Sequence, residues 1–176
     1  MVPGDGARVE SVDGYELRFA VNYLAGFELA RLLAPSLAAA QGRIVSVSSA
    51  GQAPIDFTDV MLERSYDGMR AYCQSKLAQI MMTFDSAERF AESGIAATAL
   101  HPSTYMPTKI VRSPVSSLED GVRATMRLVA DVDPSELNGR YYNVARPARA
   151  LDQAYDVADR RRLRELSERL TNVLQR

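Results

Sequence analysis

The chain has few residues that could form disulfides or metal sites. It has one cysteine, Cys73, and one histidine, His101, in 176 residues. A single cysteine excludes an intrachain disulfide, and a lone histidine leaves a metal ion without its usual set of ligands. There is also no run of eighteen apolar residues that could span a bilayer. Because the N-terminus has no charged and apolar segments typical of a signal peptide, we expect a cytoplasmic protein.

Charge of one sign is also lacking. The chain has 21 basic and 22 acidic side chains and a net charge of -1. Proteins that gather nucleic acid or anionic membranes usually have a basic excess, so we expect neither partner. The 47% of hydrophobic and 24% of charged residues are typical of a globular protein, and the length suits one domain, 1–176, with a real core.

The hydrophobic pattern alternates between strand-like and helix-like segments. Short β-branched or apolar runs bounded by Gly or Pro indicate strands, and apolar residues at helical spacing indicate helices. This alternation predicts an α/β domain in which a parallel sheet carries helices on both faces. Strands are expected at 43–49, 95–102 and 139–144. Helices are expected at 13–33, 70–91, 118–130 and 155–175, the first of them bending or ending at Pro35, and loops at 1–10 and 50–69.

The segment "AYCQSK" contains one of only two lysines in a chain rich in arginine. Its Tyr72 and Lys76 are four residues apart near the start of an expected helix, so they share one helix face. An ammonium group beside a phenol favours the phenolate and lowers a pKa that starts near ~10, which suits general acid or base catalysis. Alone, the pattern is weak, because eight tyrosines and two lysines can produce it by chance.

Polar residues also follow two expected strands. Ser48 and Ser49 end the first strand, and His101 and Pro102 end the second. Ligands of open parallel sheets bind beyond these carboxyl ends, where a Ser49 hydroxyl could donate to a substrate oxygen. A plain polar strand end explains Ser49 equally well. Asn22 lies inside an expected helix, where asparagine is unfavourable, and either solvent exposure or a specific buried bond would explain it.

Four segments together resemble the short-chain dehydrogenase/reductase family. "AYCQSK" is similar to its Tyr-x-x-x-Lys motif, and "RIVSVSSAG" to the strand and turn that supply its serine. "FAVNYLAGF" resembles the helix that supplies its asparagine, and "LHPSTYMPT" the segment beside the nicotinamide. The 23-residue spacing from Ser49 to Tyr72 and the segment "DGYELRFAVNYL" resemble the retinol-dehydrogenase-like branch. The resemblance covers about 11–144.

The resemblance implies a partial Rossmann-like, doubly wound parallel sheet and an oxidoreductase that transfers hydride between NAD or NADP and a carbonyl or alcohol substrate. It implies that Tyr72 donates or accepts the proton and that Lys76 lowers the pKa of Tyr72 and holds the nicotinamide ribose. Ser49 would orient the carbonyl, and Asn22 would hold a water that relays protons. The implied cofactor contacts are Tyr72, Lys76, Pro102, Ser103, Thr104 and Thr108.

The sequence departs from the family pattern at the nucleotide end. No G-x-x-x-G-x-G turn, which receives the cofactor pyrophosphate in the family, stands in the 176 residues. By resemblance, the first four strands are missing, and the interior strand 43–49 becomes an exposed edge. We expect a second copy, another chain that completes the sheet, or a rearranged N-terminal helix to cover it. Ser103 stands where glycine is usual, and Thr108 lies one residue beyond the usual threonine.

Two functional classes therefore stay open. The first is an oxidoreductase that is impaired or depends on a partner. The second is a non-redox relative, either an acid/base enzyme that works without the cofactor or a scaffold or regulatory subunit. For His101 a structural role is favoured over catalysis, and Cys73 is interpreted as a packed thiol. The loop 50–69 is expected to lie over the crevice and shape substrate choice.

Overall fold

The computed structural model describes residues 6–109, 111 and 113–173. Its sheet has the order β1-β2-β3-β4. The strands β1 (Arg43–Val47), β2 (Ala96–His101) and β3 (Arg140–Asn143) are parallel, which confirms the three expected strands, and β4 (Arg146–Ala148) runs antiparallel to β3. The sequence did not predict β4, because its short turn contains Val144, a β-branched residue with φ of 55° in a region that usually signals glycine.

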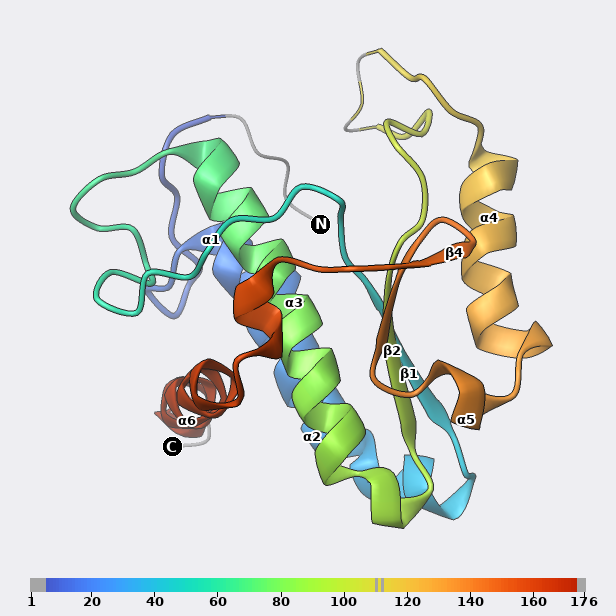
Figure 1. Cartoon of the computed structure of the whole chain (residues 1–176). Coiled ribbons are helices and arrows are strands. Elements are labelled where there is room, and N and C mark those ends of the chain that lie inside the picture. The colour runs from blue at the N-terminus through green and yellow to red at the C-terminus, as the bar shows by residue number, and fades with distance from the viewer. Residues whose placement is uncertain (1–5, 110, 112, 174–176) are drawn as a thin grey trace.

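Helices cover both faces of the sheet (Figure 1). One face carries α3, with α1, α2 and α6 packed around it, and the other carries α4 and α5. The helices are α1 (Leu17–Phe19), α2 (Ala25–Ala39), α3 (Gly68–Arg89), α4 (Leu118–Met126), α5 (Pro134–Leu137) and α6 (Val157–Val173). Short π-helical segments, η1 (Ala20–Leu24) and η3 (Arg127–Asp131), follow α1 and α4, and 3-10 turns occupy η2 (Ala91–Ser93) and η4 (Asp152–Tyr155).

The first helical segment begins later and ends later than expected. Gly14, with φ of 82°, closes a turn, and Glu16 caps α1 by accepting a 2.7 Å bond from the backbone N–H of Phe19. At the other end, α2 continues past Pro35 to Ala39. A proline inside a helix removes one backbone hydrogen bond, and this helix continues despite that loss.

The long helix α3 is the centre of the main core. Its residues 74–78 and 80–87 are buried, and they pack against β2 on one side and against α1, η1 and α6 on the others. A second, smaller core lies between the opposite sheet face and α4, η3 and α5. Since α3 is held on every side, its first turns have a fixed position next to the carboxyl ends of β1 and β2.

The C-terminal helix α6, expected at 155–175, packs on α3. Ser167 faces inward and shares a 2.8 Å hydrogen bond with the hydroxyl of Tyr23 in η1. Arg164 forms a 2.6 Å ion pair with Asp85 of α3. The expected end of this helix at 175 lies outside the described residues, as does 1–5 of the expected N-terminal loop. None of the described helices is long and apolar enough to cross a bilayer.

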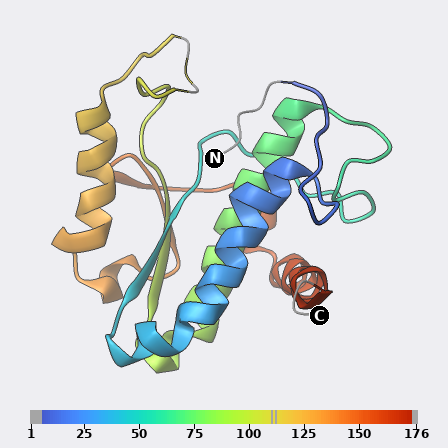
Figure 2. The same ribbon diagram turned by 180° about the vertical axis from the view of Figure 1, so that it is seen from behind.

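The strand β1 forms an open edge of the sheet. Within the described ranges it pairs with β2 alone. The N-terminal helix does not cover this edge as a strand would, because α2 packs against α3 instead (Figure 2). Three leucines of α2 (Leu29, Leu32 and Leu33) and three apolar residues of α4 (Leu118, Val122 and Met126) are exposed to solvent.

Candidate active site

A cavity of about 800 Å³ opens at the carboxyl ends of β1 and β2. Its volume lies within the range of about 300–1,000 Å³ that is usual for small-molecule sites. Its walls come from the segment after β1, the first turns of α3 and the segment after β2. The lining residues are 48–51, Met69, Tyr72, Cys73, 101–106, Thr108, Lys109, Val111 and Ser113.

Ser49 and Tyr72 meet at the wall of this cavity. Asp67 caps α3 by accepting a 2.6 Å bond from the backbone N–H of Arg70, and this fixes where the helix begins and where Tyr72 points. The side chains of Ser49 and Tyr72 share a hydrogen bond, and the Ser49 hydroxyl also accepts one from Gly51 N–H at 3.1 Å. Burial raises the pKa of Tyr72 above its usual value, although the bond to Ser49 lowers it.

Lys76 lies close to Tyr72 but points into the protein interior. Its Nζ donates to the carbonyl of Val47 at 3.0 Å and to Oε1 of Gln79 at 2.8 Å. It lies 5.8 Å from the centroid of the Tyr72 ring and outside the cavity lining. Burial lowers the pKa of Lys76 to about 8. In this arrangement burial raises the pKa of Tyr72, and the lowering of that pKa by Lys76 stays a prediction.

Lys76 and Ser48 instead join β1 to α3. The ammonium group of Lys76 binds the last carbonyl of β1, and the Ser48 hydroxyl donates back to the Lys76 carbonyl at 2.7 Å. These two bonds run in opposite directions between the same two elements. They hold the two residues before Ser49 against the helix that carries Tyr72.

Asn22 is buried and makes a specific bond, which decides between the two explanations that its sequence position left open. Its Nδ2 donates to Oγ of Ser75 at 3.0 Å, and that hydroxyl donates to the backbone carbonyl of Tyr72 at 2.7 Å. Asn22 lies in the π-helical segment η1, a distortion that occurs frequently at functional sites. It does not line the cavity.

The segment after β2 forms the opposite wall. Four residues for which cofactor contacts are expected, Pro102, Ser103, Thr104 and Thr108, all line the cavity. His101 packs beneath them and shares a 3.0 Å hydrogen bond with the Thr104 hydroxyl. Burial lowers the pKa of His101, so the imidazole is neutral near pH 7. This environment agrees with a structural role for the histidine.

Cys73 and the acidic residues give no second reactive centre here. Cys73 lines the cavity, but burial raises the pKa of its thiol, which disfavours the reactive thiolate. In the part of the chain that the structure describes, no group of three His, Cys, Asp or Glu side chains could hold a metal ion.

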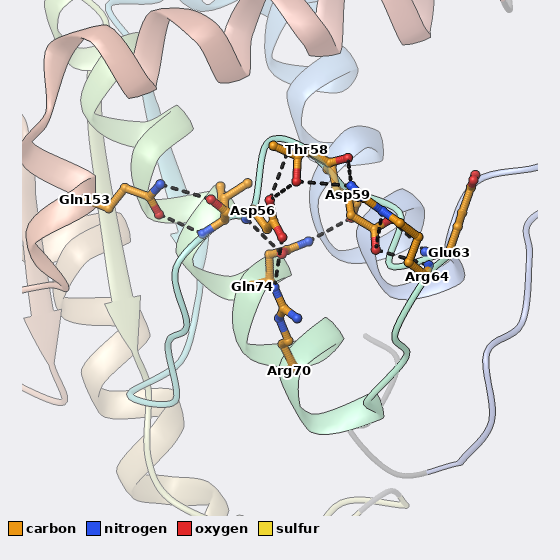
Figure 3. A network of polar contacts seen from close by, with 10 residues as sticks. Asp56, Thr58, Asp59, Glu63, Arg64, Arg70, Gln74 and Gln153 are labelled. Carbon is orange, nitrogen blue, oxygen red and sulfur yellow. Dashed lines mark hydrogen bonds and ion pairs between the residues drawn. The ribbon is translucent and has the colours of Figure 1, made fainter.

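Two glutamines that sequence reasoning missed fix the irregular segment expected over 50–69, of which only Ala50, Gly51 and Met69 line the cavity. Gln74, next to the Tyr-x-x-x-Lys pattern, donates to the carbonyl of Val60 at 2.8 Å and accepts a 3.4 Å bond from Asp56 N–H. Gln153 bonds both backbone groups of Ile55, at 2.7 and 3.2 Å. Figure 3 shows how these contacts join the segment to α3 and η4. Their partners lie 14 to 98 residues away, so no local signal could predict them.

A comparison with protein families identifies the kind of domain. The family described as short chain dehydrogenase matches residues 4–117. The chain belongs to the short-chain dehydrogenase family. Human retinol dehydrogenase 13 is 31% identical over 187 residues, which cover 92% of this chain and 55% of that protein. Retinol dehydrogenase 14 of Mus musculus is 29% identical over 181 residues, which cover 92% and 54%. This short-chain dehydrogenase spans about half the length of these relatives.

Two solved structures have the same fold. An uncharacterized protein from Mycobacterium paratuberculosis superposes with a TM-score of 0.77 and 27% identity, over 95% of this chain and 63% of that one. NADPH-bound carbonyl reductase from chicken fatty liver has a TM-score of 0.59 and 20% identity, over 84% and 61%. These likenesses confirm the Rossmann-like α/β fold expected from the sequence, and the match to the family model confirms the expected family.

Proposed function

We propose that this chain carries the substrate-binding and proton-transfer part of an NAD- or NADP-dependent oxidoreductase that acts on a carbonyl or alcohol. The main observation is the hydrogen-bonded pair of Ser49 and Tyr72 on the wall of the 800 Å³ cavity. Support comes from the named activity of the retinol dehydrogenases and from the NADPH in a structure of the same fold. When bound, the nicotinamide supplies or accepts the hydride.

The two hydroxyl groups can act on one substrate oxygen. A carbonyl oxygen placed between Ser49 and Tyr72 accepts a hydrogen bond from each, and this stabilises the negative charge that develops during reduction. Tyr72 then donates its proton to form the alcohol. Because burial raises its pKa, the phenol stays protonated near neutrality and suits the reductive direction. Alcohol oxidation needs the phenolate, so we expect its rate to rise with pH.

Asn22 and Lys76 act in this proposal as positioning residues. Asn22 supports the backbone at Tyr72 through Ser75, and Lys76 holds the end of β1 against α3. The Lys76 ammonium group has three N–H donors and uses two of them on Val47 and Gln79, so the implied ribose contact stays a prediction for the third. The water relay implied for Asn22 likewise stays a prediction.

The cavity fits the nicotinamide end of the cofactor only. Its hydroxyl groups and apolar walls suit that ring, with Tyr72, Pro102, Ser103, Thr104 and Thr108 as contacts. The sequence offers no glycine-rich turn for the pyrophosphate. We propose that a partner polypeptide, by default a second copy and otherwise a chain that completes the sheet, covers the open edge of β1. The exposed leucines of α2 support such an interface.

A second function has one supporting observation. The direction of the Lys76 amino group, toward Val47 and Gln79, favours a protein that has lost redox activity. Tyr72 would then serve as a general acid on a carbonyl or enol without a nicotinamide, or the domain would serve as a scaffold or regulatory subunit.

The deciding experiment is a titration of the purified chain with NADPH and NADH, followed by nucleotide fluorescence and thermal stability. Saturable binding is expected for the oxidoreductase, and carbonyl reduction is then measured. General acid catalysis contributes about 10²- to 10⁴-fold, so Tyr72→Phe should lower kcat/KM by about 100-fold or more. Tyr15→Phe is the matched control, because the Tyr15 hydroxyl donates to the carbonyl of Leu170 outside the cavity lining. Absence of nucleotide binding would reject independent turnover and favour the partner-dependent or non-redox function.

A further inference from the structure

The lining of the cavity has an uneven distribution of charge. Lys109 is the one charged side chain among its described lining residues, and no Asp or Glu lines it. The neighbouring His101 is neutral near pH 7, because burial lowers its pKa. The chain as a whole has 22 acidic side chains and a net charge of -1. The cavity is therefore a locally cationic site in a slightly acidic protein, and it favours anions over cations.

The loop that carries Lys109 is closed at its base. The Ser116 hydroxyl donates to the carbonyl of Thr104 at 2.6 Å, and the backbone N–H of Val115 donates to the carbonyl of Tyr105 at 3.0 Å. The next residue of the loop, Met106, packs its sulfur against Gly121 of α4, in the space that a Cβ would occupy. These contacts attach the loop to the body of the domain beside the cavity.

The charge of Lys109 is available to a ligand. Within the described ranges no carboxylate lies in ion-pair contact with it, whereas the nearby Arg123 of α4 is paired with Asp120 at 2.5 Å. A lysine ammonium is a compact charge on a flexible stem, so it can follow a single carboxylate or phosphate group. An anionic ligand group would supply the counter-charge that Lys109 lacks among these residues.

We propose that Lys109 binds an anionic group of the molecule held in the cavity, while the reacting oxygen of that molecule lies against Ser49 and Tyr72. The position of the reacting oxygen rests on the proposed function. The anion is either a carboxylate carried by an apolar carbonyl substrate or the phosphate of the nicotinamide nucleotide. The apolar lining, to which Met69, Met106 and Val111 contribute, suits the aliphatic part of such a substrate.

The first arm of the test measures binding by calorimetry and needs no turnover. The ligands are 12-oxododecanoate and its methyl ester, which share the aldehyde and chain and differ in charge. We expect the acid to bind more tightly than the ester to the unmodified chain. Lys109→Gln should lower the binding affinity for the acid about 3- to 5-fold, which is the size usual for a solvent-exposed ion pair. The affinity for the ester should stay unchanged. Lys109→Arg should retain the preference, and added salt should weaken it.

The second arm identifies the source of the anion. Nicotinamide mononucleotide and nicotinamide riboside differ by one phosphate. If the anion belongs to the nucleotide, Lys109→Gln should lower the binding affinity for the mononucleotide and leave the affinities for the riboside and the oxo acid unchanged. Arg123→Gln is the matched control in both arms, because it removes the same charge from α4 outside the cavity lining and should change neither ratio.

Two results would overturn the proposal. In one, Lys109→Gln leaves both the acid-to-ester and the mononucleotide-to-riboside affinity ratios unchanged. In the other, the unmodified chain binds neither the acid nor the mononucleotide. Both readouts are binding constants, so they are separate from the proposed redox function. A chain that binds the acid through Lys109 and shows no hydride transfer would reject that function and keep the anion site.

Discussion

Lys76 brings an amino group into the interior with only neutral partners. Its side chain is 2% exposed, and its hydrogen bonds go to a backbone carbonyl and to an amide oxygen. Burial lowers its pKa to about 8, against an ordinary value of 10.5 in the unfolded chain. Between these two pH values the unfolded chain binds more protons than the folded one. The free energy of unfolding must therefore rise with pH in this window, and the cost of burying the charge is fully present below pH 8.

Replacing Lys76 by methionine should remove this pH dependence. The difference in unfolding free energy between the original chain and Lys76→Met should change by about 1–3 kcal/mol between pH 8 and 10.5, in favour of the original chain at the higher pH. Urea unfolding across this range measures it. Lys109→Met is the matched control for the loss of a lysine, because Lys109 is exposed. Parallel curves for the original chain and Lys76→Met would contradict a depressed pKa.

The contact between Asn22 and Ser75 should be measurable as a coupling energy. Their hydrogen bond of 3.0 Å is buried, and a bond of this kind contributes about 0.5–1.5 kcal/mol. A double-mutant cycle uses Asn22→Ala, Ser75→Ala and the double variant. The loss of unfolding free energy in the double variant should differ from the sum of the two single losses by about this amount. Additive losses would show that Asn22 is held by other contacts.

At the residue scale, the motifs predicted which side chains come together and failed to predict their directions. The spacing in "AYCQSK" and the end of "RIVSVSS" place Tyr72 and Ser49 within one hydrogen bond, while the catalytic roles of both stay predictions. The direction of Lys76 depends on the carbonyl of Val47, 29 residues away, and on the burial around it. The four-residue spacing of Tyr72 and Lys76 in the sequence predicts neither the carbonyl that Lys76 binds nor its burial.

The segment between β1 and α3 shows how an element without regular structure can be held in place. The loop expected over 50–69 has no helix or strand before Gly68, as predicted. Side chains such as Gln74, Gln153 and Asp59 hold it in place (Figure 3). The carboxylate of Asp59 accepts a 2.8 Å hydrogen bond from Glu63 N–H. Hydrophobic periodicity cannot reveal such anchors, because they are single polar residues whose partners are backbone groups.

Gln74→Met should loosen this segment while the helix stays intact. The substitution keeps the length of the buried side chain and leaves the carbonyl of Val60 without its donor, which costs about 1–3 kcal/mol. Amide exchange should become faster in 55–64 and stay unchanged in the centre of α3. Gln52→Met is the comparison, because Gln52 also binds backbone groups but lies outside 55–64. Equal exchange rates in 55–64 for the original chain and Gln74→Met would contradict the anchoring role.

Helix boundaries and helix type were less predictable than helix positions. The sequence predicts helices near α3, α4 and α6, since each has a sustained apolar face. The π-helical segment η1 adds one residue to a turn and so rotates Asn22 toward Ser75. That rotation depends on packing against α3, and the hydrophobic pattern of one helix does not predict how it packs against another.

At the scale of the whole molecule, the sheet ends at an unprotected strand. An open edge presents unpaired backbone N–H and carbonyl groups, and proteins usually cover it, charge it or pair it. The helices on both sides of this sheet also expose apolar side chains. Leu29 and Leu32 of α2 are 57% and 59% exposed, and Leu118, Val122 and Met126 of α4 follow a spacing of four residues. A chain with these surfaces gains free energy by association.

We therefore expect the purified chain to associate with itself, and a charge on α2 to weaken that association. Burying one leucine is worth about 1.5–3 kcal/mol, so Leu32→Glu should weaken self-association by about tenfold or more. Sedimentation velocity over a range of concentrations measures it. Val12→Glu is the matched control, because Val12 is fully exposed in the loop before α1 and should leave the association unchanged. Leu32 is itself exposed, so thermal stability at low concentration should not fall. A monomer at every concentration would exclude a second copy as the partner at this edge.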